Sequence, residues 1–158
     1  MFEKKDFNEN LRFFQSALNK NNDDLDSLYG LAVSQDRLGL TASSLENFQK
    51  ALKIAPDDSD ILRDFGIAYF KSGHPGEAMQ YLKKAVELDG NDVIALSYLG
   101  KSYEADGNYL AAIQIYKQLV AKNSTDAEIF YSLAFAYGKM NNSGESNYNF
   151  GIYFNKKG

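Results

Sequence analysis

The stretch AMQYLKKAVELDGND, residues Ala78–Asp92, runs directly into VIALSYLGKSY, residues Val93–Tyr103. An acidic turn containing Gly90 separates two segments with helical spacing, and Asn91 or Asp92 can cap the second by accepting hydrogen bonds from its first backbone N–H groups. The apolar or small residues of the first segment are Ala78, Leu82, Ala85, Val86 and Leu88. The stretch therefore predicts two helices joined by a tight turn.

The same pattern returns along the chain with a period of 34 residues. Residues of one kind stand one period apart: Ala17, Ala51 and Ala85; Leu28, Leu62, Leu96 and Phe130; Gly39, Gly73 and Gly107, with Asn141 next; and Phe14, Phe48, Leu82, Tyr116 and Phe150. A period shared by several kinds of residue indicates a repeat protein, in which each unit buries its apolar face against its neighbours.

Each period divides into two helices. In one period Leu62, Phe65 and Tyr69 lie at helical spacing, Gly73 suits the end of that helix, and Pro75 suits the first turn of the next. Small residues recur where closely packed backbones need room, at Ala32, Gly66, Gly100 and Ala134 in the first helix and at Ser44, Ala78, Ala112 and Ser146 in the second. The pattern predicts hairpins of two tightly packed helices.

These motifs resemble the tetratricopeptide repeat family, whose signature is W-x2-L-G-x2-Y, then A-x3-F, then P, over 34 residues. The matching copies are Leu62-x2-Phe65-Gly66-x2-Tyr69 with Ala78-x3-Leu82, and Leu96-x2-Leu99-Gly100-x2-Tyr103 with Ala112-x3-Tyr116. The first full copy reads Leu28-x2-Leu31-Ala32-x2-Gln35, then Ser44-x3-Phe48 and Pro56, so Gln35 departs from the aromatic residue. Leu or Phe replaces the Trp throughout. The resemblance implies an all-α fold, a right-handed α-solenoid of antiparallel helix pairs.

The repeat pattern predicts one domain over residues 1–158. Residues 1–22 form a partial repeat with its second helix only, residues 25–58, 59–92 and 93–126 form full repeats, and residues 127–158 form a final irregular or partial repeat. Residues 145–156 have two interpretations. If the 34-residue register continues, they are the second helix of that last repeat, although Tyr153 is large for its place. Phe150-Gly151-x2-Phe154 also fits the first helix of another repeat. Both ends suggest a fragment of a longer protein.

Composition excludes several classes of function. The net charge of −4 opposes nucleic-acid binding and excludes the RNA-reading pentatricopeptide relatives, which need a basic face and a 35-residue period. The absence of cysteine excludes disulfides and thiolate metal sites. No apolar run could span a membrane, and the start MFEKKDFNEN lacks the apolar region of a signal peptide. We expect a soluble protein without membrane insertion, and favour the cytoplasm.

The residues offer little for catalysis. His74 is the only histidine, and we interpret it as an exposed turn residue that can cap the helix beginning at Pro75. The acidic pairs Asp23-Asp24 and Asp57-Asp58 fall at helix starts, where carboxylates favour the positive end of the helix dipole. Neither a Walker-type phosphate loop nor an HExxH zinc motif occurs. We expect no enzyme activity, no metal and no cofactor.

The family resemblance implies that the first helices line a concave groove that binds peptides of a partner protein. Several residues that it places there are large and apolar, which is typical of a binding surface. Tyr98, Tyr131 and Phe135 would anchor the peptide, while Arg63 and Lys101 would set its orientation. The full set is Tyr29, Val33, Arg63, Ile67, Phe70, Ser97, Tyr98, Lys101, Tyr131 and Phe135.

The charges around this groove narrow the ligand. Chaperone-binding relatives hold a C-terminal carboxylate with Lys, Asn and Arg from successive first helices, but the matching places here hold Tyr29, Val33, Asp64, Ile94 and Tyr98. A shift by one repeat supplies only Arg63, with Glu128 where a cation should be. The chaperone tail is therefore not the expected ligand. A cationic strip of Arg63, Lys71, Lys101 and Lys139 instead favours a peptide with apolar anchors and one or two acidic residues.

Two alternatives to an independent peptide-binding module stay open. The repeats could form a structural arm of a larger polypeptide, or they could self-associate through uncapped ends. The tail from Tyr131 to Gly158 resembles repeat segments found downstream of some bacterial zinc peptidase domains, although no zinc motif accompanies it. That resemblance implies a peptidase-associated arm.

Overall fold

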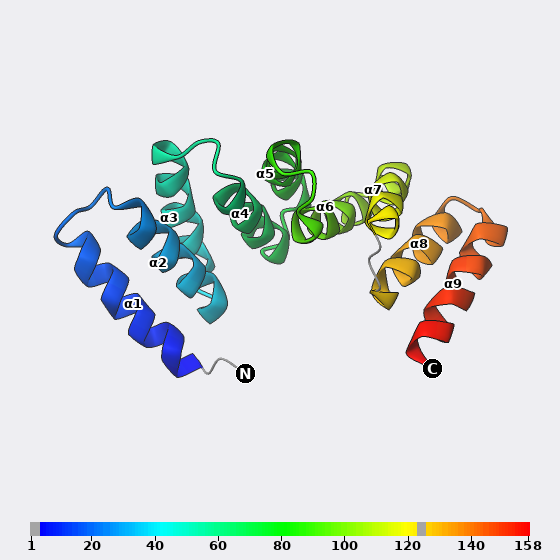
Figure 1. Cartoon of the computed structure of the whole chain (residues 1–158), viewed down its shortest axis with the longest axis horizontal. Helices are drawn as coiled ribbons and strands as arrows, with labels where there is room; N and C mark the ends of the chain where they lie inside the picture. Colours follow the sequence, from blue (N-terminus) through cyan, green and yellow to red (C-terminus); the bar gives the residue numbers. More distant parts are fainter. Residues whose placement is uncertain (1–3, 123–125) are drawn as a thin grey trace. The chain divides into compact units, whose positions relative to one another are not determined.

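The structure, a computed structural model, describes residues 4–122 and 126–158, with side chains from Phe7 onward. Within those ranges it contains nine α-helices and no strand (Figure 1). The helices are α1 (Lys4–Leu18), α2 (Leu25–Leu38), α3 (Thr41–Ile54), α4 (Ser59–Lys71), α5 (Pro75–Leu88), α6 (Val93–Ala105), α7 (Tyr109–Ala121), α8 (Ala127–Lys139) and α9 (Ser143–Lys157). The chain is thus an all-α helical repeat protein, as the period predicts.

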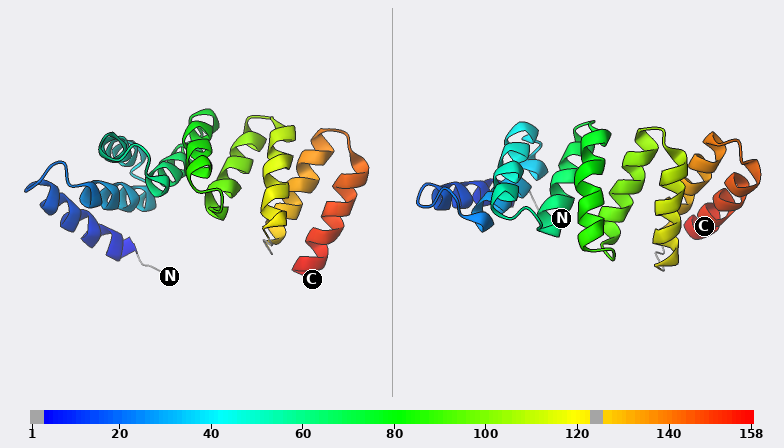
Figure 2. Two further views of the ribbon diagram at one scale, coloured as in Figure 1. Left: turned by 45° about the horizontal axis from the view of Figure 1, so that its top comes forward. Right: turned by 90° about the horizontal axis from the view of Figure 1, so that it is seen from above.

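The chain divides into two compact units, Met1–Gly90 and Asn91–Gly158. In the first unit α2 pairs with α3 and α4 pairs with α5, while α1 packs on α2 and α3 packs on α4. In the second unit α6 pairs with α7 and α8 pairs with α9, with α7 packed on α8. Figure 2 shows α8 and α9 as neighbouring antiparallel helices in both views.

The glycine series one period apart ends the first helix of each pair. Gly39, Gly73 and Gly107 have φ values of 76°, 83° and 78°, the left-handed region in which a side chain is strained. Asn141 continues the series with φ of 58°, and it is the one non-glycine residue with positive φ in the part of the chain that the structure describes. Asparagine tolerates this region better than most residues. The predicted helix ends are confirmed.

A second series, which the sequence prediction recognised only in part, caps the first helices. The carboxylates of Asp24, Asp58, Asp92 and Asp126 accept hydrogen bonds from backbone N–H groups of the first turns of α2, α4, α6 and α8. The neighbouring Asp57 does not cap a helix and pairs instead with Lys84 over 2.7 Å. His74 is exposed and occupies the N-cap position of α5, but its ring makes no cap hydrogen bond, and its Nδ1 lies 3.0 Å from the Ser72 hydroxyl.

Small and large residues complement each other inside each pair. A Cβ atom on Gly66 would lie 2.7 Å from Leu82, and one on Gly100 would lie 2.5 Å from the Tyr116 ring. Among the aromatic residues of the repeat motifs, Phe48, Phe65 and Tyr116 are buried, while Tyr69 and Tyr103 are half-buried. These contacts fix how closely the two helices of a pair approach.

The last helix, α9, packs against α8 as the second helix of a pair. The Ser146 hydroxyl donates to the Ala134 carbonyl over 2.8 Å, just as the Ser44 hydroxyl donates to the Ala32 carbonyl over 2.9 Å in the first full pair. Tyr153, large for its place, is half-buried with its ring 5.4 Å from that of Tyr131.

Candidate functional site

The ten predicted groove residues all lie on the first helices of their pairs. Their environments differ between the two units. The first unit holds Tyr29 and Val33 on α2 and Arg63, Ile67 and Phe70 on α4, and the second holds Ser97, Tyr98 and Lys101 on α6 and Tyr131 and Phe135 on α8.

In the first unit, Tyr29 connects two successive first helices. Its hydroxyl donates a hydrogen bond of 2.6 Å to the Asp64 carboxylate on α4. Burial, together with this hydrogen bond, raises the pKa of Tyr29 above its ordinary value. Tyr29 and Val33 also pack against the core cluster, and Ile67 is only 9% exposed. Most of the area of these side chains therefore goes into packing between repeats.

The cations of the first unit are paired with carboxylates. Arg63 Nε donates to Asp64 over 2.9 Å, and another guanidinium nitrogen of Arg63 contacts Asp60. Lys71 Nζ lies 2.6 Å from the Asp36 carboxylate on α2. These ion pairs neutralise most of the positive charge that the sequence suggests for the first unit. Phe70, the residue before Lys71, is half-buried.

The second unit presents aromatic rings accompanied by lysines. Lys101 Nζ lies 5.2 Å from the centre of the half-buried Tyr98 ring, and Lys139 Nζ lies 5.2 Å from the centre of the Phe135 ring. Neither ammonium forms an ion pair with a carboxylate among the described residues, although the charge of Lys101 acts on Glu104 one turn later on α6. Phe135 also packs against Tyr109, whose ring centre is 6.3 Å away in an edge-to-face arrangement. This contact supports the Phe135 ring beside Lys139.

Tyr131 is the most exposed aromatic residue of the predicted set. It is 44% exposed, and its ring packs 5.7 Å from that of Phe150. Its hydroxyl makes no hydrogen bond within the described part of the chain, in contrast to that of Tyr29. Ser97, at the equivalent place one repeat earlier, is half-buried.

The residues at the positions where chaperone-binding relatives hold a carboxylate do not supply cations in this chain. Asp64 binds Tyr29 and Arg63, Ile94 is exposed and apolar, and Glu128 pairs with Lys157 over 2.8 Å. None of these three side chains offers a cation to a peptide carboxylate.

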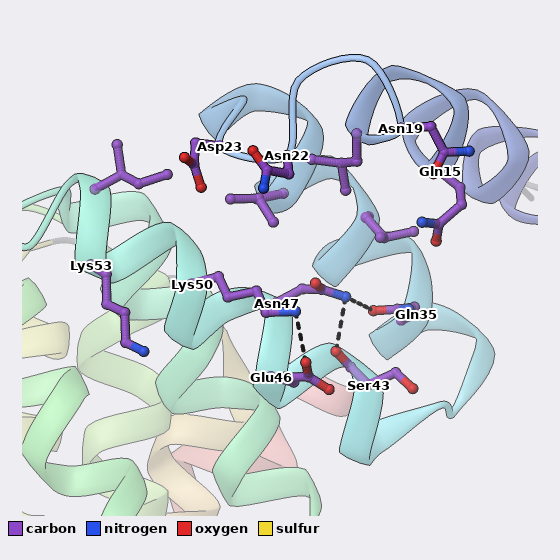
Figure 3. Close-up of a pocket in the computed structure, with 14 residues that line it drawn as sticks. Gln15, Asn19, Asn22, Asp23, Gln35, Ser43, Glu46, Asn47, Lys50 and Lys53 are labelled. Carbon is purple, nitrogen blue, oxygen red and sulfur yellow. Dashed lines mark hydrogen bonds and ion pairs between the residues drawn. The ribbon is translucent and has the colours of Figure 1, made fainter.

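One hollow in the first unit was not predicted. A cavity of about 660 Å³ lies between α1 and α3, above α2 (Figure 3). Its floor contains Gln35, the residue that replaces the aromatic of the repeat signature, hydrogen-bonded to Asn47 of α3. The sequence shows that Gln35 departs from the aromatic residue of the repeat signature. Its partner Asn47 becomes evident only when Asn47 is compared with Tyr81, the residue one period later.

Two further features bear on function. No group of three or more His, Asp or Glu side chains in residues 4–122 and 126–158 is arranged to hold a metal ion. None of the helices in those ranges is both long enough and apolar enough to cross a membrane.

Family models of the tetratricopeptide repeat match residues 25–58 and 63–127. The chain belongs to the tetratricopeptide repeat family. No curated protein matches the sequence. Among solved structures, the chain is similar to MamA, with 21% identity and a TM-score of 0.91 over 98% of this chain and 90% of that one. It is also similar to MamA from Desulfovibrio magneticus RS-1, with 19% identity and a TM-score of 0.90 over 96% of this chain and 85% of that one.

A third similar structure is that of YrrB, a tetratricopeptide repeat protein with an unusual peptide-binding site. It shares 21% identity and a TM-score of 0.88 over 96% of this chain and 78% of its own. At these identities the similarity establishes the fold of the repeats.

Proposed function

We propose that this tetratricopeptide repeat protein is a protein–protein interaction module that binds a peptide segment of a partner on its first helices. The observation that carries the proposal is the surface of α6 and α8, where Tyr98 and Phe135 each lie beneath a lysine that forms no ion pair in the described residues. Partly exposed aromatic rings beside lysine ammonium groups are typical of interaction sites.

The chemistry of this surface favours a peptide that is apolar and acidic. Tyr131 and Phe135 offer apolar area to bury, and Lys101 and Lys139 offer ammonium groups to carboxylates of the ligand. The α2 and α4 half would contribute less charge, because Asp36, Asp60 and Asp64 already bind its cations. Removal of one anchoring ring at such a surface costs about 1–3 kcal/mol of binding free energy.

Selection from a displayed peptide library tests the proposal. The wild type would be compared with a Tyr98→Ala, Tyr131→Ala double variant and with Tyr148→Ala, a control at a 67% exposed tyrosine on the second helix α9. We expect the wild type and the control to select acidic peptides with apolar anchors, and the double variant to bind them at least tenfold more weakly. Retention of full affinity by the double variant would exclude this surface.

Self-association is a second candidate, favoured by the exposed face of α9. Phe154 is 66% exposed, whereas Leu52, Val86 and Val120, its counterparts in earlier repeats, are half-buried. A second copy could cover this ring. Light scattering over a range of concentrations would then show a mass that rises in the wild type and in Tyr148→Ser but not in Phe154→Ser; a constant monomer mass in all three excludes this candidate.

A further inference from the structure

The cavity beside α2 is built from residues that belong to a single unit. Leu18, Leu28 and Leu31 are among the residues that line it, together with polar residues of α1, the α1–α2 turn and α3 (Figure 3). A second cavity of about 450 Å³ adjoins it and shares Gln15, Asn19, Leu31 and Gln35. Volumes of several hundred cubic ångströms are typical of ligand sites.

The cavity exists because a polar pair replaces an aromatic pair. One period later, Tyr69 and Tyr81 occupy the places of Gln35 and Asn47, and their rings stack 5.5 Å apart with an interplanar angle of 3°. In the first full repeat, Asn47 Nδ2 donates instead to Gln35 Oε1 over 2.8 Å. Two amides fill less volume than two phenol rings, and the difference leaves space above α2.

The hydrogen bonds of this pair leave one donor group and one acceptor unused. Asn47 Nδ2 donates both to Gln35 Oε1 and to the Ser43 carbonyl, over 3.1 Å, and the second bond fixes which end of the Asn47 amide carries nitrogen. Gln35 Nε2 and Asn47 Oδ1 then have no partner among the described residues. Both side chains are only 9% exposed, yet no side-chain nitrogen or oxygen sealed from solvent in that part of the chain lacks a partner. The two unused groups therefore open into the cavity.

A donor beside an acceptor matches the N–H and C=O of one extended residue, which point to the same side of the chain. We propose that this cavity binds an extended peptide segment through one such residue, whose carbonyl accepts from Gln35 Nε2 while its N–H donates to Asn47 Oδ1. An apolar side chain of the same segment lies on Leu28 and Leu31. Burial strengthens the recognition, because buried amides without partners are costly.

The charges of the rim favour an uncharged ligand segment. Lys50 is paired with Glu46 over 2.7 Å, and the remaining rim charges, Asp23 and Lys53, are of opposite sign. No single sign dominates the cavity, so neither a phosphate nor a cation matches it. A neutral peptide main chain does.

This site is separate from the proposed groove. Leu28, Leu31 and Gln35 follow one face of α2, whereas Tyr29 and Val33 lie on another face of the same helix, toward α4. The two sites share no residue, so either can bind while the other is disabled.

The test uses N-acetyl-leucine methylamide, which carries an apolar side chain together with the N–H and C=O of one residue, in an NMR titration of the whole chain. N-acetyl-N-methyl-leucine methylamide, in which a methyl group replaces the hydrogen of the leucine N–H, is the matched probe. We expect saturable shifts of the Gln35 and Asn47 side-chain NH2 signals and of the Leu28 and Leu31 methyl signals. Affinity for the N-methylated probe should be about threefold to tenfold lower, the contribution of one hydrogen bond.

Variants locate the binding. The double substitution Gln35→Tyr, Asn47→Tyr installs the aromatic pair that the next repeat holds at these places, and should abolish the methyl shifts. Gln49→Tyr, on the exposed side of α3, is the control and should bind as the wild type does. Absent or unsaturable shifts, equal affinity for both probes, or unchanged shifts in the double variant would each overturn the proposal. The comparison of the two probes on the wild type stands even where the double variant does not fold.

Discussion

The hydroxyl of Tyr29 on α2 donates a hydrogen bond of 2.6 Å to the carboxylate of Asp64 on α4, 35 residues later in the chain. Asp64 also accepts from Arg63 Nε over 2.9 Å. A residue expected at a ligand surface thus joins two consecutive repeats of the first unit. Tyr131, which stands at the place of Tyr29 in the last repeat, has no such partner in the described residues.

This difference predicts unequal effects for the same substitution. Tyr29→Phe should lower the free energy of unfolding by about 1.5–3 kcal/mol, because it removes a hydrogen bond to a charged group and leaves a half-buried carboxylate with one donor fewer. Tyr131→Phe should change it by less than about 0.5 kcal/mol. Urea unfolding followed by circular dichroism measures both. Equal losses in the two variants would mean that the Tyr29 hydrogen bond contributes no stability.

Alkaline pH should destabilise the folded chain through its buried tyrosines. Burial, followed by the charge and the hydrogen bond of Glu104, raises the pKa of Tyr116, whose hydroxyl lies 2.9 Å from that carboxylate. Above about pH 10 the unfolded chain loses this proton while the folded chain retains it. Stability is therefore fully present below that pH and falls as the pH rises, by up to about 1.4 kcal/mol per pH unit for one tyrosine.

Denaturation at several pH values between about 9 and 11 tests this slope. Tyr116→Phe should show a shallower fall than the wild type, whatever its stability near neutral pH. Tyr148→Phe, at an exposed position, is the control and should keep the wild-type slope. If Tyr116→Phe kept the wild-type slope, the loss of stability at alkaline pH could not be attributed to Tyr116.

Two helical glycines in the second unit should respond in opposite directions to alanine. Gly100→Ala places a Cβ atom 2.5 Å from the ring of Tyr116, which is 1% exposed and held by its hydrogen bond, so overpacking should cost about 1–3 kcal/mol. Gly151→Ala meets nothing within 4 Å and should stabilise α9 by about 0.5–1 kcal/mol. The melting temperatures of the two variants test this prediction. A similar loss of stability in both variants would show that lack of space at Gly100 does not cause the destabilisation.

The fold could be predicted because its causes are local and recur. Gly73 and Pro75 set a helix end and a helix start, and Gly66 with Leu82 sets the approach of a pair. Each of these choices is made within one repeat and is copied at a fixed period, so the sequence pattern alone contains it. The family assignment follows from the same positions.

The contacts of the candidate surface could not be predicted in the same way. Lys71 has the charge that the sequence suggests, but its partner Asp36 lies on α2, so this pair depends on how successive repeats stack. Arg63 pairs instead with Asp60 and Asp64 on its own helix. The cavity depends on Gln35 and Asn47, two residues on different helices whose amides compensate each other. Ligand binding by the ten groove residues stays a prediction, to be tested on Tyr98 and Tyr131.

Two adjacent aspartates before α4 have different roles: Asp58 caps the helix, and Asp57 forms a surface ion pair. Asp58 accepts from the N–H groups of Asp60 and Ile61, each over 3.0 Å, so Asp58→Ala should cost about 1–2 kcal/mol. Asp57 pairs with Lys84 at a largely exposed site, so Asp57→Ala should cost less than about 0.5 kcal/mol.

Substitution by asparagine distinguishes the physical cause. Asp58→Asn keeps an oxygen acceptor at the cap and should recover most of the stability that Asp58→Ala loses, since asparagine caps about as well as aspartate. Urea denaturation of the three variants provides the comparison. If Asp58→Asn were as unstable as Asp58→Ala, the negative charge of Asp58 near the positive end of the α4 dipole, rather than its hydrogen bonds, would be what stabilises the start of this helix.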